Sequence, residues 1–210
     1  MAYPVVSAPY GFKPINLVGG LPFAGATRAL PIASAYSSNI FNGDDVLLSD
    51  GSIILSTLAN DTSPVAGLIG VFLGCSYTNP STKQKVYSQY WPASTVASDA
   101  IAYIAENPNT LYQVVLVSGT TVNGSTTGLQ PAYLGASAVG SNAAIVRNTG
   151  LTTSGDSRVG IYTATGSTTS SLPVRIVDVV PETANSSGNF CEFIVRFNFG
   201  YHSYEYSTGS

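Results

Sequence analysis

Apolar and polar residues alternate most regularly near the C-terminal end of the chain. From Cys191 to Phe199 every second residue is apolar, and Glu192 and Arg196 lie among the residues between them. A period of two sends successive side chains to opposite faces of a strand. The pattern therefore predicts a strand with five apolar side chains on one face. We expect Phe197→Asp on that face to unfold the domain.

Four other runs carry strand patterns. Residues 111–117 and 174–180 are rich in β-branched side chains, which predicts two further strands. Residues 86–91 alternate and stop before Pro92, as an edge strand does. Residues 94–106 fit a helix or a strand, and we favour the strand because its apolar residues lie at consecutive positions on both faces.

Residues 36–91 organise the rest of the chain, because turn dipeptides bound the apolar runs there. Asn42-Gly43 and Asp50-Gly51 favour turns, since Gly accepts positive φ and Asn or Asp tolerates it. A strand, an Asp-Gly turn and a second strand predict a hairpin within residues 40–55, and residues 66–77 add a second apolar run. We expect structural turn positions at Gly43, Asp44, Asp50, Gly51, Gly70 and Gly74.

The first 31 residues differ from the rest in their proline and glycine content. Five prolines and four glycines prevent a helix and disfavour a central strand, so we expect an extended arm. Its aromatic and aliphatic residues are too many for a disordered segment. The arm must pack on its own domain or reach a neighbouring subunit, and the sequence leaves both open.

The spacing of the turns predicts the fold class. Turn signals recur about every ten residues in the first half of the chain, which is typical of all-β sandwiches and barrels. We predict an arm at residues 1–31 and a single β domain at residues 32–210, built as a β-barrel or β-sandwich. Residues 118–173 form a loop-rich sub-lobe or long insertions with weak strands inside. The C-terminal strands fall within residues 174–200.

Composition narrows the classes of partner. Charged residues make up 9% of the chain and the net charge is −3. No group of Lys or Arg exceeds two members, whereas binding to phosphate backbones needs many cations, so we expect no direct nucleic-acid partner. No apolar run reaches the roughly 18 residues of a membrane span, and residues 1–4 lack the basic start of a secretory signal. We therefore expect no membrane association.

Residues suited to catalysis or metal binding are scarce. His202 is the only histidine, and no nucleophile elbow, phosphate loop or dinucleotide fingerprint is present. We expect an ordinary surface or interface histidine, no enzyme activity and no cofactor. Asp44, Asp45 and Asp50 form the one local acidic group. We expect Asp44 to accept backbone hydrogen bonds within its turn, with a cation site and catalysis as the other readings.

Cysteine and tyrosine raise two further questions. Cys75 and Cys191 lie far apart in the sequence. We expect buried free thiols, with a disulfide as the alternative, because lone cysteines behave as small hydrophobic residues. The chain's thirteen Tyr suit either sugar stacking or protein contacts. For Tyr201, Tyr204 and Tyr206 we favour protein contacts.

The turn-rich segment resembles a known family. A Gly-Asp turn, an Asp-Gly turn and a later Gly-Val-Phe-x-Gly-x-x-Tyr run are similar to the capsid cement or decoration proteins of tailed bacteriophages. The run from Gly11 to Pro14 resembles the N-terminal approach segment of those proteins. The resemblance covers the first half of the chain better than the second. The matching residues are Ile40, Gly43, Asp44, Val46, Asp50, Gly51, Gly70, Val71, Phe72, Gly74 and Tyr77.

The resemblance implies a function. It implies a non-enzymatic virion structural protein, assembled in the host cytoplasm, that binds the outer capsid surface and cements neighbouring major capsid proteins. Its partners would be the major capsid protein and further copies of itself, commonly as a homotrimer. The alternative is a carbohydrate-binding or adhesive β-module of a phage tail or cell surface. Candidate interface residues are Tyr10, Phe12, Lys13, Pro14, Tyr201, Tyr204 and Tyr206. Deleting residues 1–22 is expected to leave a folded domain.

Overall fold

The computed structural model describes most of the chain, namely residues 6–56, 67–118, 130–132, 134–162, 168, 170–184, 190–198 and 202–205. These residues form an all-β structure, as the spacing of turns and apolar runs predicts. Within them, the one helical element is a short 3-10 turn, η2 (Ala136–Ala138). In the same part of the chain, no helix has the length and apolarity needed to cross a membrane.

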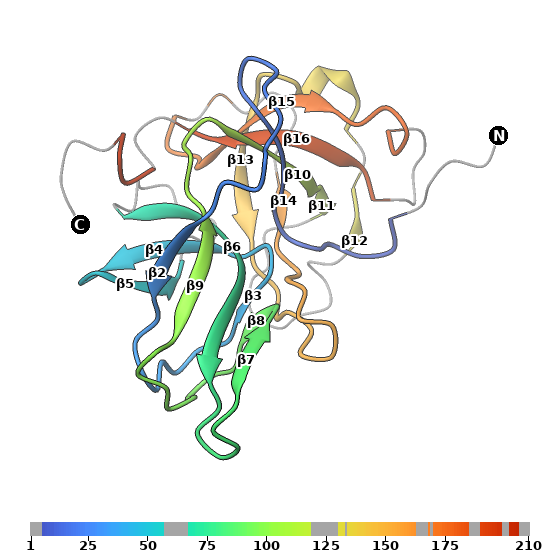
Figure 1. The fold of residues 1–210 in the computed structure, drawn as a ribbon. Coiled ribbons are helices and arrows are strands. Elements are labelled where there is room, and N and C mark those ends of the chain that lie inside the picture. The colour runs from blue at the N-terminus through green and yellow to red at the C-terminus, as the bar shows by residue number, and fades with distance from the viewer. Residues whose placement is uncertain are drawn as a thin grey trace.

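The first of two six-stranded sheets contains the C-terminal strands and is antiparallel throughout. Its order is β1-β10-β16-β15-β13-β14, so β1 and β14 are its edges. The strands are β1 (Lys13–Leu17), β10 (Thr110–Val115), β13 (Asn142–Val146), β14 (Gly160–Tyr162), β15 (Val174–Val179) and β16 (Glu192–Phe197). This first sheet occupies the upper part of Figure 1.

The second six-stranded sheet contains the turn-rich segment. Its order is β2-β9-β6-β4-β5, and β7 pairs with β6 beside that path. The strands are β2 (Arg28–Pro31), β4 (Asp45–Ser49), β5 (Ser52–Leu55), β6 (Leu68–Thr78), β7 (Lys85–Ser88) and β9 (Ile101–Ala105). Two small pairs complete the fold: β3 (Ile40–Phe41) with β8 (Tyr90–Trp91), and β11 (Val117–Ser118) with β12 (Gln130–Pro131). The second sheet lies at the lower left of Figure 1.

The two sheets pack against each other around the main core. Phe12, Tyr112 and Phe197 on the first sheet's side meet Leu68 and Val71 of β6, and none of the five is more than 3% exposed. The Phe197 ring lies 5.3 Å from the rings of both Phe12 and Tyr112. Isolated bridges join Ile32 to Ile53 and Leu116 to Ile161, but among the described residues the continuous strand pairing of neither sheet closes on itself. The architecture is therefore a β-sandwich and not a closed barrel.

The second sheet is buried on its far face as well. Ile40, Phe72, Cys75 and Tyr77 lie there in a second cluster around Trp91. β6 is thus covered on both faces, which explains why its sequence is almost continuously apolar. Trp91 is fully buried, with the Tyr77 ring edge-on to it at 5.3 Å. It is a core residue and offers no surface for stacking a sugar.

Gly70 and Gly74 lie inside β6 and not in turns, which corrects the expectation for both. Their φ angles are 149° and 147°. A Cβ on Gly70 would lie 2.1 Å from the Ala105 carbonyl oxygen in β9, and one on Gly74 would lie 3.0 Å from the Ser88 carbonyl oxygen in β7. The pairing of β6 with β4 and β9 shifts register at these points. The glycines therefore permit bulges where neighbouring backbones approach closely.

The hairpin and the C-terminal strand follow the sequence predictions. β4 and β5 are antiparallel neighbours, and φ is 49° at Asp50 and 75° at Gly51, as a type I′ turn requires. In β16 the alternate residues from Phe193 to Phe197 are buried, whereas Phe199 lies outside the described residues. Glu192 is buried too, which the alternation does not predict.

Three weaker patterns have mixed outcomes. Within residues 94–106, β9 confirms the strand interpretation for residues 101–105, whereas residues 94–100 are turns and irregular backbone. The predicted edge strand at residues 86–91 is divided between β7 and β8, which pair with different partners. Within the loop-rich region, β13 and β14 confirm the expected weak strands, and both belong to the first sheet. Every residue of β13 is buried, so this strand is part of the core.

The described part of the N-terminal segment is built into both sheets. β1 is an edge strand paired with β10, and β2 is an edge strand paired with β9. The pairing of β1 shifts register after Pro14, and Pro31 lies at the end of β2, as expected for prolines in sheets. Phe12 is in the main core. The described residues of this segment therefore pack on their own domain, which is the first of the two alternatives.

Candidate functional site

The turn between β3 and β4 is the junction of the two halves of the sandwich. The Gly43 N–H donates to the Phe72 carbonyl at 2.8 Å, and the Gly43 carbonyl accepts from the Phe12 N–H at 2.9 Å. Gly11, with φ of 82°, crosses so closely that a Cβ would lie 2.6 Å from the Gly43 oxygen. This turn therefore joins the N-terminal segment to β6, and Gly is required on both sides of the crossing.

Asp44 fixes this turn with both carboxylate oxygens. Oδ2 accepts from the Phe41 N–H at 2.8 Å, and Oδ1 accepts from the Ser157 hydroxyl at 2.5 Å. The first bond confirms the turn role expected for Asp44. The second is a cross-link to the segment before β14. Burial raises the pKa of Asp44 to about 6, although both hydrogen bonds and the Arg147 charge act to lower it.

Asp45 forms a buried ion pair with Arg147. The Asp45 side chain is fully buried and that of Arg147 is 11% exposed, and Nη2 of Arg147 contacts Oδ1 of Asp45. Asp45 opens β4 and Arg147 follows β13, so the pair joins the two sheets. Among the described residues, Asp45 Oδ2 and Arg147 Nε have no hydrogen-bond partner. Removing either member would leave an uncompensated buried charge.

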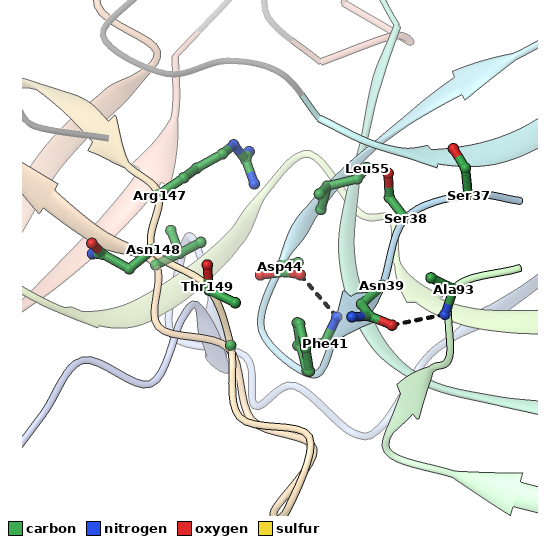
Figure 2. Close-up of a pocket in the computed structure, with 12 residues that line it drawn as sticks. Ser37, Ser38, Asn39, Phe41, Asp44, Leu55, Ala93, Arg147, Asn148 and Thr149 are labelled. Atoms are coloured by element: carbon green, nitrogen blue, oxygen red, sulfur yellow. Dashed lines mark hydrogen bonds between the residues drawn. The ribbon is translucent and has the colours of Figure 1, made fainter. Parts of the chain in front are cut away.

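A pocket of about 370 Å³ opens beside these groups (Figure 2). Polar side chains from both halves of the molecule line it, and Phe41 and Leu55 add apolar surface. A Cβ on Gly150 would lie 2.4 Å from the Phe41 ring, so glycine lets that loop rest on the ring. The polar lining comprises Ser37, Ser38, Asn39, Asp44, Arg147, Asn148 and Thr149. Hydroxyl, amide and guanidinium groups beside one aromatic ring suit a small polar ligand.

The predicted N-terminal interface residues gather around another hollow, of about 490 Å³. Tyr10, Phe12, Lys13 and Pro14 all line it. Phe12 is only 1% exposed and belongs to the core, whereas Lys13 is exposed. The Tyr10 hydroxyl donates to the buried Glu192 carboxylate, and burial raises the pKa of Tyr10 well above its usual range. The four residues therefore form one surface, with two of them tied to the core.

Of the C-terminal tyrosines, Tyr204 is described, whereas Tyr201 and Tyr206 lie outside the described residues. Tyr204 is 53% exposed. Its hydroxyl donates to Glu106 Oε2 at 2.8 Å and accepts from Arg28, which also pairs with Glu106 at 3.1 Å. Tyr204 thus fastens the C-terminal segment to β2 and to the end of β9, while much of its ring remains in solvent.

His202 is buried within the chain, which corrects the expectation of an ordinary surface or interface histidine. It is 2% exposed, and Nδ1 accepts from the Tyr204 N–H at 3.2 Å. Nε2 therefore carries the proton and donates to the Glu106 carbonyl at 2.7 Å. Burial lowers the pKa of His202 below its ordinary value. Both ring nitrogens hold the C-terminal segment in place, and neither is available for proton transfer without breaking these bonds.

Cys75 and Cys191 are buried free thiols, as predicted. Burial raises the pKa of Cys75 to about 12 and that of Cys191 to about 11, so neither is a reactive thiolate. Within the described ranges, no three His, Cys, Asp or Glu side chains are grouped so as to hold a metal ion.

Sequence reasoning missed the partners of Asp44 and Asp45. Arg147 pairs with Asp45 and Ser157 donates to Asp44, although Arg147 and Ser157 lie in a region that looks like loops. The sequence signal that could have revealed these contacts was the scarcity of charged residues. In a chain with 9% charged residues, two consecutive aspartates before an apolar strand indicate that at least one has a buried partner.

Comparison with known proteins found no relative of this chain. No protein-family model, no curated protein and no solved structure matches the chain. The resemblance to capsid cement proteins therefore depends on the sequence motifs alone, and it stays a prediction.

Proposed function

We propose that the protein is a non-enzymatic virion component that binds the outer capsid surface and cements neighbouring major capsid proteins. Most residues that carry the resemblance, from Val46 to Tyr77, support this because they lie in β4, β6 and the turn between β4 and β5 of the second sheet. The scarcity of charge supports it as well, because the centres of protein interfaces are depleted in charged residues.

An exposed apolar tip between β1 and β2 carries the proposal. We define the apolar tip as residues 17–21; it lies on the dark blue connection at the top of Figure 1. Val18 is 46% exposed and Leu21 is 64% exposed. Gly19 and Gly20 have φ of 96° and 85° and reverse the chain. Two exposed apolar side chains that share one short turn offer an apolar surface for a protein contact.

Backbone hydrogen bonds make the apolar tip rigid. The Leu17 N–H donates to the Leu21 carbonyl at 2.7 Å, and the Val18 N–H donates to the Asn109 carbonyl at 2.8 Å. A contact segment that is already ordered loses little conformational entropy on binding. In a homotrimer three such tips would engage one shell, so that modest individual contacts sum to durable attachment.

Capsids assembled from the major capsid protein of the same virus provide the test. We expect wild-type protein to occupy them saturably, measured by co-sedimentation and cryo-electron microscopy. The double variant Val18→Ser/Leu21→Ser should bind at least about tenfold more weakly, since each apolar side chain contributes roughly 1.5–3 kcal/mol when buried. Leu151→Ser, at a 38% exposed position in another loop, is the matched control and should bind normally.

The possible results distinguish an error in the proposed function from an error in the proposed contact surface. Wild-type protein that leaves capsids undecorated would overturn the proposed function. Full occupancy by the double variant, with wild-type decoration intact, would instead show that another surface makes the contact. Analytical ultracentrifugation of the free protein tests the expected homotrimer.

The pocket in Figure 2 favours one second candidate, a carbohydrate-binding module. Hydroxyl, amide and guanidinium side chains line it beside the Phe41 ring, and such groups can donate to or accept from sugar hydroxyls. A glycan array should then give a saturable ligand. Thr149→Ala in the pocket should weaken its binding, whereas Thr152→Ala, exposed in the same loop, should not. An array without hits would remove this candidate.

A further inference from the structure

Two arginines on the outer face of the first sheet take no part in the core or in the contacts described so far. Arg175 of β15 and Arg196 of β16 are direct partners in the antiparallel register. Opposed residues in such a pair have side chains on the same face of the sheet. Val174 and Phe197, their neighbours in the two strands, are buried in the main core. The two guanidinium groups therefore share the opposite, outer face.

This placement is unfavourable for the isolated fold. Like charges directly opposite each other destabilise a sheet. The chain has only eight Lys and Arg residues, and two of them occupy this one pair. Among the described residues, Glu205 is the acidic group within ion-pair distance, with 3.9 Å between its Oε1 and Arg196 Nη2. Two arginines and one glutamate leave an excess positive charge.

Two asparagines orient Arg175. Asn142 of β13 is the register partner of Arg175, and its Oδ1 accepts from the Arg175 Nε–H at 2.6 Å. The same oxygen accepts from Asn198 Nδ2 at 3.2 Å. Asn142 is 2% exposed, so this anchor is itself fixed by burial. A guanidinium held through Nε keeps its two terminal NH₂ groups for the fork that binds carboxylate or phosphate.

These four side chains and Ser170 line a hollow of about 420 Å³. We propose that this hollow is an oxyanion site, which takes the phosphate, sulfate or carboxylate group of a larger molecule. Arg175 and Arg196 supply the charge, and Asn142, itself bonded by Asn198, orients Arg175. The bound group would lie between the two guanidiniums and remove their repulsion.

Thermal unfolding of the full chain at low ionic strength tests the site. The probes are sodium phosphate, sodium sulfate and a short peptide of Glu and Asp, each at constant chloride. At least one should raise the wild-type Tm saturably. Arg175→Gln and Arg196→Gln should each weaken that probe about tenfold, as expected for loss of a charged hydrogen-bonding partner. Lys83→Gln, which removes an exposed charge elsewhere, should leave the response unchanged.

The Tm of the protein without a probe provides a second readout, in which the substitution has the opposite expected effect. Without a probe, Arg175→Gln should melt no lower than wild type, because the substitution relieves the repulsion; at a saturating probe concentration it should melt lower. Arg175→Lys keeps the charge but loses the planar fork, and it should bind the probe more weakly than wild type. If Arg175→Gln folds poorly, Arg175→Lys tests the site in its place.

The probe that binds identifies the source of the anion. Saturation by the acidic peptide alone indicates a carboxylate on a protein, and saturation by phosphate or sulfate indicates an ester or free ion. Either result supports the site. No saturable response to any probe, or an equal response from the Arg175→Gln/Arg196→Gln double variant, would overturn it.

Discussion

At the scale of single residues, the few buried charges have specific partners. Asp44 binds Ser157, Asp45 pairs with Arg147, and Glu192 accepts from Tyr10. Burying a charge is costly unless it is paired or hydrogen-bonded, so each partner is needed to keep its acid folded in place. Although these positions are few, substitutions there should therefore lower the free energy of unfolding strongly.

Asp44 should make stability depend on pH. Its pKa rises from 3.8 to about 6 on folding, so its stabilising contribution is complete below the unfolded-state value and is lost as pH rises through the folded-state value. Asn at this position keeps an acceptor for the Phe41 N–H and does not titrate. Relative to Asp44→Asn, the wild-type free energy of unfolding should fall by about 3 kcal/mol from about pH 3.5 to about pH 7.

Urea unfolding of both proteins across this pH range measures the difference. His202 works in the opposite direction, because a pKa lowered by burial removes stability as pH falls below the unfolded-state value. His202 titrates in wild type and variant alike, so its contribution cancels. A difference that stays constant with pH would contradict a buried ionisable Asp44.

The ion pair between Asp45 and Arg147 should resemble other buried pairs. Asp45→Ala leaves the guanidinium buried without its counter-charge, and we expect a loss of about 3–5 kcal/mol in urea unfolding. Adding Arg147→Met should restore part of that loss. The exposed pair of Lys85 and Asp99, with side chains 41% and 44% exposed, is the control. Lys85→Met should cost less than about 1 kcal/mol, and equal losses at the two pairs would contradict the burial of the first.

At the scale of elements, β6 determines how the second sheet is assembled. It pairs with β4, β7 and β9 and is buried on both faces. The apolar run predicted its presence. The run did not predict that Gly70 and Gly74 are strand residues, because a glycine that permits a close approach looks the same in a sequence as one that makes a turn.

Gly70→Ala separates these two uses of glycine. A Cβ there meets the Ala105 carbonyl oxygen at 2.1 Å, whereas a Cβ on Gly19 meets nothing within 4 Å. Both residues have positive φ, so both substitutions carry a conformational cost of about 1 kcal/mol. Gly70→Ala adds overpacking and should lose roughly 3 kcal/mol or more in total. Similar melting curves for the two variants would contradict the close approach of β6 and β9.

At the scale of the whole molecule, the N-terminal segment belongs to the sandwich. β1 and β2 form one edge of each sheet, and Phe12, the residue immediately before β1, lies in the main core. Tyr10, Lys13 and Pro14 gather around one hollow, and their role in an interface stays a prediction. Phe12 faces inward, and its ring fills the core edge-on to the ring of Tyr112.

Deleting residues 1–22 should therefore unfold the protein, contrary to the expectation from the sequence. The deletion removes β1 and the Phe12 ring, which is 1% exposed and packs on Phe197. Circular dichroism and gel filtration should show loss of the folded monomeric unit. Phe12→Ala, which keeps the strand, should lose about 3–5 kcal/mol. A truncated chain with native near-ultraviolet circular dichroism would contradict this role.

The sequence by itself determined the local features of this protein. Alternation marked β16, β-branched runs marked β10 and β15, and Asp50-Gly51 marked the hairpin turn. Asp44 was identified as a turn residue from its neighbours alone. These features are encoded locally, because periodicity and turn preference depend on residues a few positions apart.

Tertiary structure alone decided which distant residues meet. Strand order made β1 and β2 edges, placed Arg175 opposite Arg196, and brought Arg147 to Asp45. It also buried His202, although its sequence neighbourhood is polar. Such contacts depend on the pairing register of strands far apart in the chain. A one-residue slip in that register sends every side chain to the other face, and no local pattern encodes it.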